Sequence, residues 1–222
     1  MKRIPEPEIM SSKEEARVYR EADFSEVNQA FACRVLEIVP QTAGVLIDLG
    51  CGPGDILIRT MKFIPRFFFI GLDASTEMIK LAVEEVKKNQ YSQKIFFLQG
   101  DAKKLSFTSQ TFDVIISNSL VHHLLDPLPL WEEVKRVIKP GGTVLFRDLC
   151  RPSTPEAAWE IVEKYSGNEP SLLKTLFFNS LNASFTLDEI KGQLTQTGIL
   201  GLSVKMCSDR HWEVAGKIEH LS

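Results

Sequence analysis

Three glycines at alternate positions follow a short apolar run in the stretch VLIDLGCGPGD, residues 45–55. The run contains one acid, Asp48, and the glycines are Gly50, Gly52 and Gly54. A strand that ends in such a turn, with a helix just after it, presents a backbone without side chains, so that a ligand can approach closely. Glycines after a strand also serve as plain turn residues. The acids described next favour a ligand-binding loop, to which Cys51 contributes its backbone.

Two further acids follow later apolar runs. In FFFIGLD, Asp73 comes at the end of the expected second strand, where an acid of a nucleotide-binding sheet accepts ribose hydroxyls. In FLQGDA, Asp101 ends the expected third strand, where it could contact an adenine amino group or simply form a turn after Gly100. The sequence therefore predicts a nucleoside-binding site at the ends of three strands.

The glycine spacing is D-x-G-x-G-x-G and differs from the G-x-G-x-x-G of dinucleotide-binding folds. Together with GDA, FDVIISN and KPGGTVLF, in that order, the loop and its acids resemble the class I S-adenosylmethionine-dependent methyltransferases over roughly residues 40 to 148. The resemblance implies S-adenosylmethionine as cofactor and S-adenosylhomocysteine as product. It also implies a Rossmann-like α/β fold, in which a seven-stranded, mostly parallel sheet has an antiparallel last strand and helices on both faces.

The same resemblance assigns roles to residues of this chain. The glycine loop would hold the methionine portion of the cofactor, with Asp48 orienting it, and Asp73 would bind the ribose. Asp101 and Ala102 would frame the adenine, and Met78 would lie either against it or in the core. The expected cofactor-binding set is Asp48, Gly50, Cys51, Gly52, Gly54, Asp73, Ala74, Met78, Asp101, Ala102 and Asn118.

The segment after the fourth strand bears on the acceptor. Methyltransferases of nucleic acid bases carry Asn/Asp-Pro-Pro-aromatic here, whereas SNSLVHHLLDP is similar to small-molecule methyltransferases, including those of quinone precursors. We expect a small-molecule acceptor. His122 and His123 would point about 100° apart on a helix, so that only one can face the cofactor. That imidazole could deprotonate an acceptor, or could be packed under the glycine loop. Because no His/Asp/Glu cluster with ligand spacing stands out, we expect no metal.

Composition excludes other classes. The 222 residues carry a formal net charge of −3, which argues against a nucleic acid partner. The four cysteines form no C-x-x-C pair, and no apolar run is long enough to span a membrane. We therefore expect a soluble cytoplasmic enzyme that acts at no membrane; its oligomeric state is open.

Apolar runs alternate with helical patterns, which is typical of a parallel sheet covered by helices. Strands are expected near 44–49, 67–72, 95–98, 113–117, 142–147, 202–207 and 212–218. Helices are expected over 56–63, 76–88, 130–138 and 187–197, the last with a capping box of Thr186 and Glu189. We expect one domain, residues 1–222, made of an N-terminal helical cap (11–39), a cofactor-binding core (40–150), a helical lid (151–185) and a C-terminal helix and hairpin (186–222).

Strand direction places the acceptor side. Ligands bind beyond the C-terminal ends of parallel strands, where the fifth strand ends and the sixth runs out. The expected substrate-binding residues are Tyr19, Asn28, Arg147, Asp148, Arg151, Arg210 and His211. The arginines could bind an acidic acceptor, although salt bridges to Asp148 and Asp209 explain them equally well.

Three other functions stay open. A nicotinamide oxidoreductase would need the missing G-x-G-x-x-G spacing. A cofactor-binding module without catalysis is compatible with a sequence that identifies no indispensable base. An aminopropyltransferase shares the fold, but the acids that would hold a polyamine are not evident.

Overall fold

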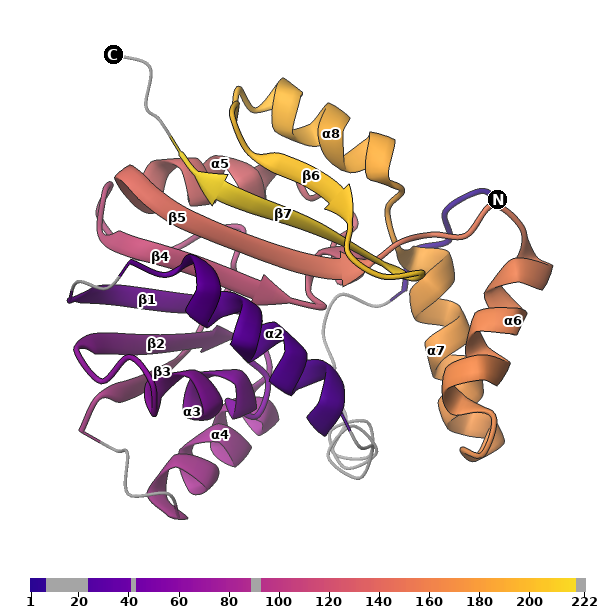
Figure 1. The fold of residues 1–222 in the computed structure, drawn as a ribbon, viewed down its shortest axis with the longest axis horizontal. Helices are drawn as coiled ribbons and strands as arrows, with labels where there is room; N and C mark the ends of the chain where they lie inside the picture. Colours follow the sequence, from indigo (N-terminus) through magenta and orange to yellow (C-terminus); the bar gives the residue numbers. More distant parts are fainter. Residues whose placement is uncertain (7–23, 41–42, 89–92, 219–222) are drawn as a thin grey trace.

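The computed structural model describes residues 1–6, 24–40, 43–88 and 93–218. Its centre is a seven-stranded sheet in the order β3-β2-β1-β4-β5-β7-β6 (Figure 1). β7 pairs antiparallel with both neighbours, whereas β1 to β5 run parallel. The strands are β1 Gly44–Leu49, β2 Phe67–Asp73, β3 Ile95–Gln99, β4 Phe112–Asn118, β5 Ile138–Leu149, β6 Ser203–Met206 and β7 His211–Lys217. This confirms the expected fold class.

Helices connect the strands close to where the sequence predicts them. The helices are α2 Ser25–Ile38, α3 Asp55–Met61, α4 Thr76–Lys88, α5 Leu128–Val137, α6 Pro155–Ser166, α7 Ser171–Ala183 and α8 Leu187–Gln196, with a short 3-10 turn, η1, at Val121–His123. The capping box at the start of α8 is confirmed, because Thr186 and Glu189 each bond the other's backbone N–H. Among the described residues, no helix has both the length and the apolar character needed to cross a bilayer.

The two faces of the sheet bury different sets of side chains. Ile47, Ile115 and Val144 pack with α5 and α8, whereas Leu46, Val114 and Leu145 pack with α2 and α3. Successive strand residues point to opposite faces, so strands covered on both sides read as nearly continuous apolar runs. The burial of both faces thus explains why these strands were recognisable from the sequence.

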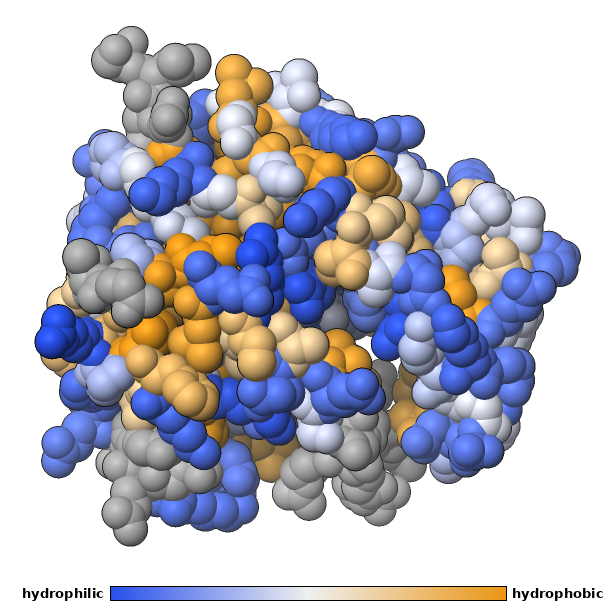
Figure 2. All heavy atoms as spheres, viewed as in Figure 1, coloured by the Kyte–Doolittle hydropathy of each residue, from blue (hydrophilic) through white to orange (hydrophobic). Residues whose placement is uncertain are grey.

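The stretch 151–185 forms α6 and α7, which stand beside the sheet as a lobe (Figure 1). Leu149, Ala158, Val162 and Leu181 form a small core under this lobe. In the space-filling view a notch separates the lobe from the body of the molecule, and the lobe's visible surface is mostly hydrophilic (Figure 2). Its function as a lid stays a prediction. Of the expected cap, the described part is α2, and the remainder before Phe24 lies outside the described residues.

The first six residues lie along α7 and η1. Arg3 donates to the carbonyl oxygens of Ala183, His122 and Leu124, and the Ile4 N–H donates to the Asn182 carbonyl. The Arg3 guanidinium also lies 3.8 Å from the centre of the Phe185 ring. Several bonds to separate elements therefore fix this segment beside η1.

Candidate active site

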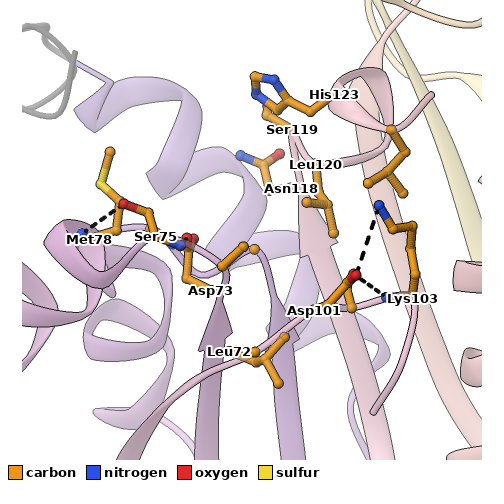
Figure 3. A pocket seen from close by; sticks show the side chains of 16 residues that line it. Leu72, Asp73, Ser75, Met78, Asp101, Lys103, Asn118, Ser119, Leu120 and His123 are labelled. Atoms are coloured by element: carbon orange, nitrogen blue, oxygen red, sulfur yellow. Dashed lines mark hydrogen bonds and ion pairs between the residues drawn. The ribbon is translucent and has the colours of Figure 1, made fainter. Parts of the chain in front are cut away.

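A pocket opens at the C-terminal ends of β1, β2 and β4. Parallel strands bring their C-terminal ends to one edge of the sheet, where ligands of this architecture bind. Of the residues singled out from the sequence, those that line the pocket are Gly50, Gly52, Asp73, Ala74, Met78, Asp101, Ala102, Asn118 and His123. Figure 3 shows Asp73, Ser75 and Met78 on one side, Asp101 and Lys103 on another, and His123 beyond Asn118.

The glycine loop folds back onto the end of β2. The N–H groups of Gly50 and Cys51 both donate to the Leu72 carbonyl, and the Gly52 N–H donates to Oδ2 of Asp73 at 2.9 Å. Gly52 has a φ of +51°, and a Cβ atom built on it would meet nothing within 4 Å. A side chain there would project into free space at the pocket wall, whereas this backbone conformation suits glycine.

Asp73 connects two sides of the pocket. Its Oδ1 accepts the Ser75 N–H at 2.8 Å while Oδ2 holds the loop. Burial raises the pKa of Asp73, and the bonds from Ser75 and Gly52 partly offset this rise. Each carboxylate oxygen has two lone pairs, so further hydrogen bonds from hydroxyl groups in the pocket remain available.

Asp101 and Met78 lie on the pocket wall in contrasting settings. Asp101 is exposed and accepts the Lys103 N–H at 2.8 Å, which makes it a turn residue as well as a pocket residue. Met78 is buried, so it belongs both to the core and to the wall. The turn role of Asp101 and the core role of Met78 are confirmed, and the contact of each with an adenine stays a prediction.

Three expected cofactor residues do not line the pocket. A Cβ on Gly54 would lie 2.8 Å from the Phe97 ring, so this glycine allows close packing, and Cys51 is buried. Asp48 is 1% exposed, and neither carboxylate oxygen has a hydrogen-bond partner among the described residues. Burial, reinforced by the charge of Asp73, raises the pKa of Asp48 well above its usual value.

The two histidines occupy different environments. His122 is buried, and its Nδ1 lies 2.5 Å from Oδ1 of Asp148. His123 lines the pocket, and its Nδ1 lies 3.0 Å from Oε1 of Glu6. Burial is the largest single influence and disfavours the charged ring, but the charge of Asp148, its hydrogen bond and the charge of Glu6 together raise the pKa of His122. As expected for adjacent residues, only one of the two rings faces the pocket.

The expected substrate-binding arginines are engaged elsewhere and do not line the pocket. Arg147 donates to Glu213 at 2.6 Å, Arg151 donates to Glu189 at 2.6 Å, and Arg210 stacks on the Tyr165 ring at 3.3 Å. The alternative of salt bridges to Asp148 and Asp209 is confirmed for Arg210, whose Nη1 lies 3.5 Å from Oδ1 of Asp209. It is wrong in its partners for Arg147 and Arg151, which pair with glutamates from other elements.

The other expected acceptor residues that the structure describes also lie apart from the pocket. Asn28 donates to Asp55, and Asp148 binds His122. Burial is the main reason that the pKa of His211 is lowered to about 4, so its ring is neutral at pH 7. Tyr19 lies outside the described residues.

Sequence reasoning missed several residues at this site. Ser75, Lys103, Ser119 and Leu120 also line the pocket. Ser119 has a φ of +59°, a conformation that a serine seldom adopts and that no pattern in SNSL announces. Glu6, which contacts both histidines, is separated from them by more than half the chain, so no local spacing could reveal it.

Comparisons with known proteins agree on one family. A family model described as a methyltransferase domain matches residues 41–199. The chain is 35% identical over 119 residues to an uncharacterized methyltransferase of Schizosaccharomyces pombe, and the matched region covers 51% of this chain and 42% of that protein. It is 32% identical over 130 residues to a demethylmenaquinone methyltransferase of Lactobacillus johnsonii, covering 57% of this chain and 53% of that protein. The chain thus spans about half the length of these curated relatives.

A solved structure shares the fold. The crystal structure of a S-adenosylmethionine-dependent methyltransferase from Aquifex aeolicus superposes with a TM-score of 0.70 at 20% identity, covering 91% of this chain and 97% of that one. At this identity the likeness concerns the fold.

Proposed function

We propose that this chain transfers a methyl group from S-adenosylmethionine to a small-molecule acceptor. The chain belongs to the class I S-adenosylmethionine-dependent methyltransferases. The observation that carries the proposal is that the glycine loop and Asp73 line the same pocket, where the Gly52 N–H donates a hydrogen bond to the Asp73 carboxylate. No dinucleotide spacing is present, so this assignment is preferred to a nicotinamide oxidoreductase.

The pocket residues fit this cofactor. The space beside Gly52 leaves the loop backbone open to the methionine portion, and Asp73 has lone pairs for the ribose hydroxyls. Asp101, Ala102 and Met78 would hold the adenine. Behind the loop, the buried carboxyl group of Asp48 has no hydrogen-bond partner among the described residues and a raised pKa. A cationic ligand group nearby would favour its ionised form and compensate the buried charge. We assign these residues to cofactor binding on that fit.

For methyl transfer, the main task of the protein is to position the acceptor relative to the methyl group. The cofactor supplies an electrophilic methyl group, which is transferred in line to a nucleophilic atom of the acceptor. The protein then has to hold the acceptor at the right distance and angle and to keep water away. His123 is the histidine that we place beside the acceptor, because its ring lines the pocket while His122 is buried against Asp148.

We propose a quinone-type small molecule as the first acceptor class to test, because relatives of this chain are named demethylmenaquinone methyltransferases. The experiment is a turnover assay with S-adenosylmethionine labelled in the methyl group and a panel of small acceptors that includes demethylated quinols. Labelled product and an equal amount of S-adenosylhomocysteine are expected. If the chain binds S-adenosylhomocysteine but methylates no acceptor, including those of a cell extract, it is a binding module and the proposal is wrong.

A further inference from the structure

Three potential metal ligands from distant parts of the chain meet at the rim of the pocket. Oε1 of Glu6 lies 3.0 Å from Nδ1 of His123 and 3.4 Å from Nε2 of His122. One potential ligand atom from each of the three side chains lies within 4.8 Å of the other two. Zinc bonds nitrogen and oxygen ligands at about 2.0–2.2 Å, so tetrahedral ligand atoms lie roughly 3.3 Å apart. The two distances to Glu6 are close to that spacing.

A buried carboxylate orients the His122 ring from behind. Asp148 is completely buried, and it accepts the backbone N–H of His122 and of Leu149 besides facing Nδ1 of His122. A metal-binding histidine ordinarily donates its second ring N–H to a carboxylate in this way. With Nδ1–H directed to Asp148, the lone pair of Nε2 points to Glu6. Two hydrogen-bond acceptors then face each other, which is favourable only with a cation or a proton between them.

Glu6 is held in place by its own segment. Arg3 anchors that segment on the carbonyl oxygens of His122 and Leu124, and the Ser180 hydroxyl donates to the Glu6 carboxylate. Glu6 and His123 are both largely buried, with side-chain exposures of 15% and 17%. The carboxylate is therefore not a surface group that meets the histidines by chance.

We propose that Glu6, His122 and His123 form a binding site for a divalent transition metal ion, with Zn²⁺ as the best match. Two imidazoles and one carboxylate suit Zn²⁺ and related ions, and three protein ligands leave a further position open. Because His123 also lines the pocket, an acceptor oxygen or a water molecule that enters from the pocket can take that position. The site revises the sequence-based expectation of no metal, and it does not depend on the proposed methyl transfer.

The test is calorimetric titration of ZnCl₂ into the chain without a polyhistidine tag, after removal of metal with a chelator. We expect one ion per chain with a dissociation constant below about 1 μM. In parallel, CoCl₂ should give the visible absorption of a low-symmetry, tetrahedral-type cobalt site. Absence of both signals would overturn the proposal and leave a proton-sharing network of Glu6 and the histidines.

Three variants locate the ion. Glu6→Gln keeps the side-chain volume, and His123→Ala removes a ligand at the rim; each should weaken Zn²⁺ binding at least about tenfold. Glu160→Gln, on the exposed side of α6, is the matched control and should bind within about twofold of the parent. If Glu6→Gln and His123→Ala bind as the parent does, the ion sits elsewhere, for example at the exposed Cys33 or Cys207, and the proposal is wrong.

A second readout separates this proposal from the proposed function. The affinity of the metal-free chain for S-adenosylhomocysteine should stay within about threefold of that of the zinc-loaded chain, because the cluster lies at the pocket rim and not among the residues assigned to the cofactor. If His123→Ala does not fold by circular dichroism, the isosteric Glu6→Gln variant decides the outcome.

Discussion

The backbone N–H of Gly52 lies 2.9 Å from Oδ2 of Asp73, so the glycine loop and the acid at the end of β2 form one bonded unit. The Gly50 and Cys51 N–H groups strengthen the unit by sharing the Leu72 carbonyl. A ligand that touches the loop therefore also meets the acid. Motifs that the sequence presents separately act together at the pocket.

Gly52→Ala should reduce the affinity for S-adenosylhomocysteine at least tenfold, because the new methyl group projects into the free space of the pocket that the cofactor would fill. Gly141→Ala is the matched control. Both glycines have positive φ, and neither would place its Cβ within 4 Å of another atom, so both substitutions cost about 1–2 kcal/mol of backbone strain. Gly141 is an exposed residue of β5 that does not line the pocket. Equal affinities of the two variants in calorimetric titration would mean that the loop at Gly52 is only a turn.

Asp73→Asn should weaken S-adenosylhomocysteine binding at least tenfold. The amide nitrogen cannot accept a hydrogen bond, so either the ribose or one of the N–H groups of Gly52 and Ser75 loses its partner. Charge-assisted bonds of this kind contribute about 1.5–3 kcal/mol each. Thermal unfolding of the variant without ligand measures how much the substitution destabilises the loop itself, apart from its effect on ligand binding. Unchanged affinity in a folded variant would show that the ribose is held elsewhere.

Asp48→Asn should stabilise the free protein, and increasingly so as the pH rises. The pKa of Asp48 is raised in the folded state, so above the unfolded-state pKa the folded protein retains a proton that the unfolded chain has lost, and stability falls with pH up to the folded pKa. Asparagine does not titrate. The free energy of unfolding in urea should favour the variant more at pH 8 than at pH 5. Parallel pH profiles of the two proteins would contradict this.

Arg147→Ala and Arg210→Ala should leave S-adenosylhomocysteine affinity within about threefold of the parent, because neither side chain lines the pocket. Their effects on stability should differ. Arg147→Ala removes a partner of the buried Glu213 and should cost about 1–3 kcal/mol, whereas Arg210 lies over the partly exposed Tyr165. Calorimetry measures the cofactor affinity, and urea unfolding measures the free energy of unfolding. A tenfold loss of cofactor affinity in either variant would indicate that the cofactor binds closer to β5 and β7 than we propose.

The sequence predicted the fold well because its signals are local. β1, Gly44–Leu49, and α4, Thr76–Lys88, begin and end where their patterns predict. A strand buried on both faces gives a continuous apolar run, and an amphipathic helix gives a helical apolar periodicity, so both can be recognised from neighbouring residues. Asp73 and Asp101 were placed correctly at strand ends for the same reason. Contacts between distant segments carry no such signal. Glu6 reaches His122 and His123 only through the folded path of the first six residues, and the pairing of Arg147 with Glu213 depends on the register of β5 and β7.

The assignment of this pocket to S-adenosylmethionine is tested most directly by calorimetric titration of S-adenosylhomocysteine into the parent chain, with NAD⁺ and NADP⁺ as competing ligands. We predict one site per chain with a dissociation constant on the order of 1–100 μM, which corresponds to about −8 to −5.5 kcal/mol, and no displacement by either nicotinamide nucleotide. Absence of binding at millimolar S-adenosylhomocysteine, or tighter binding of a nicotinamide nucleotide, would contradict the assignment of the glycine loop and Asp73 to this cofactor.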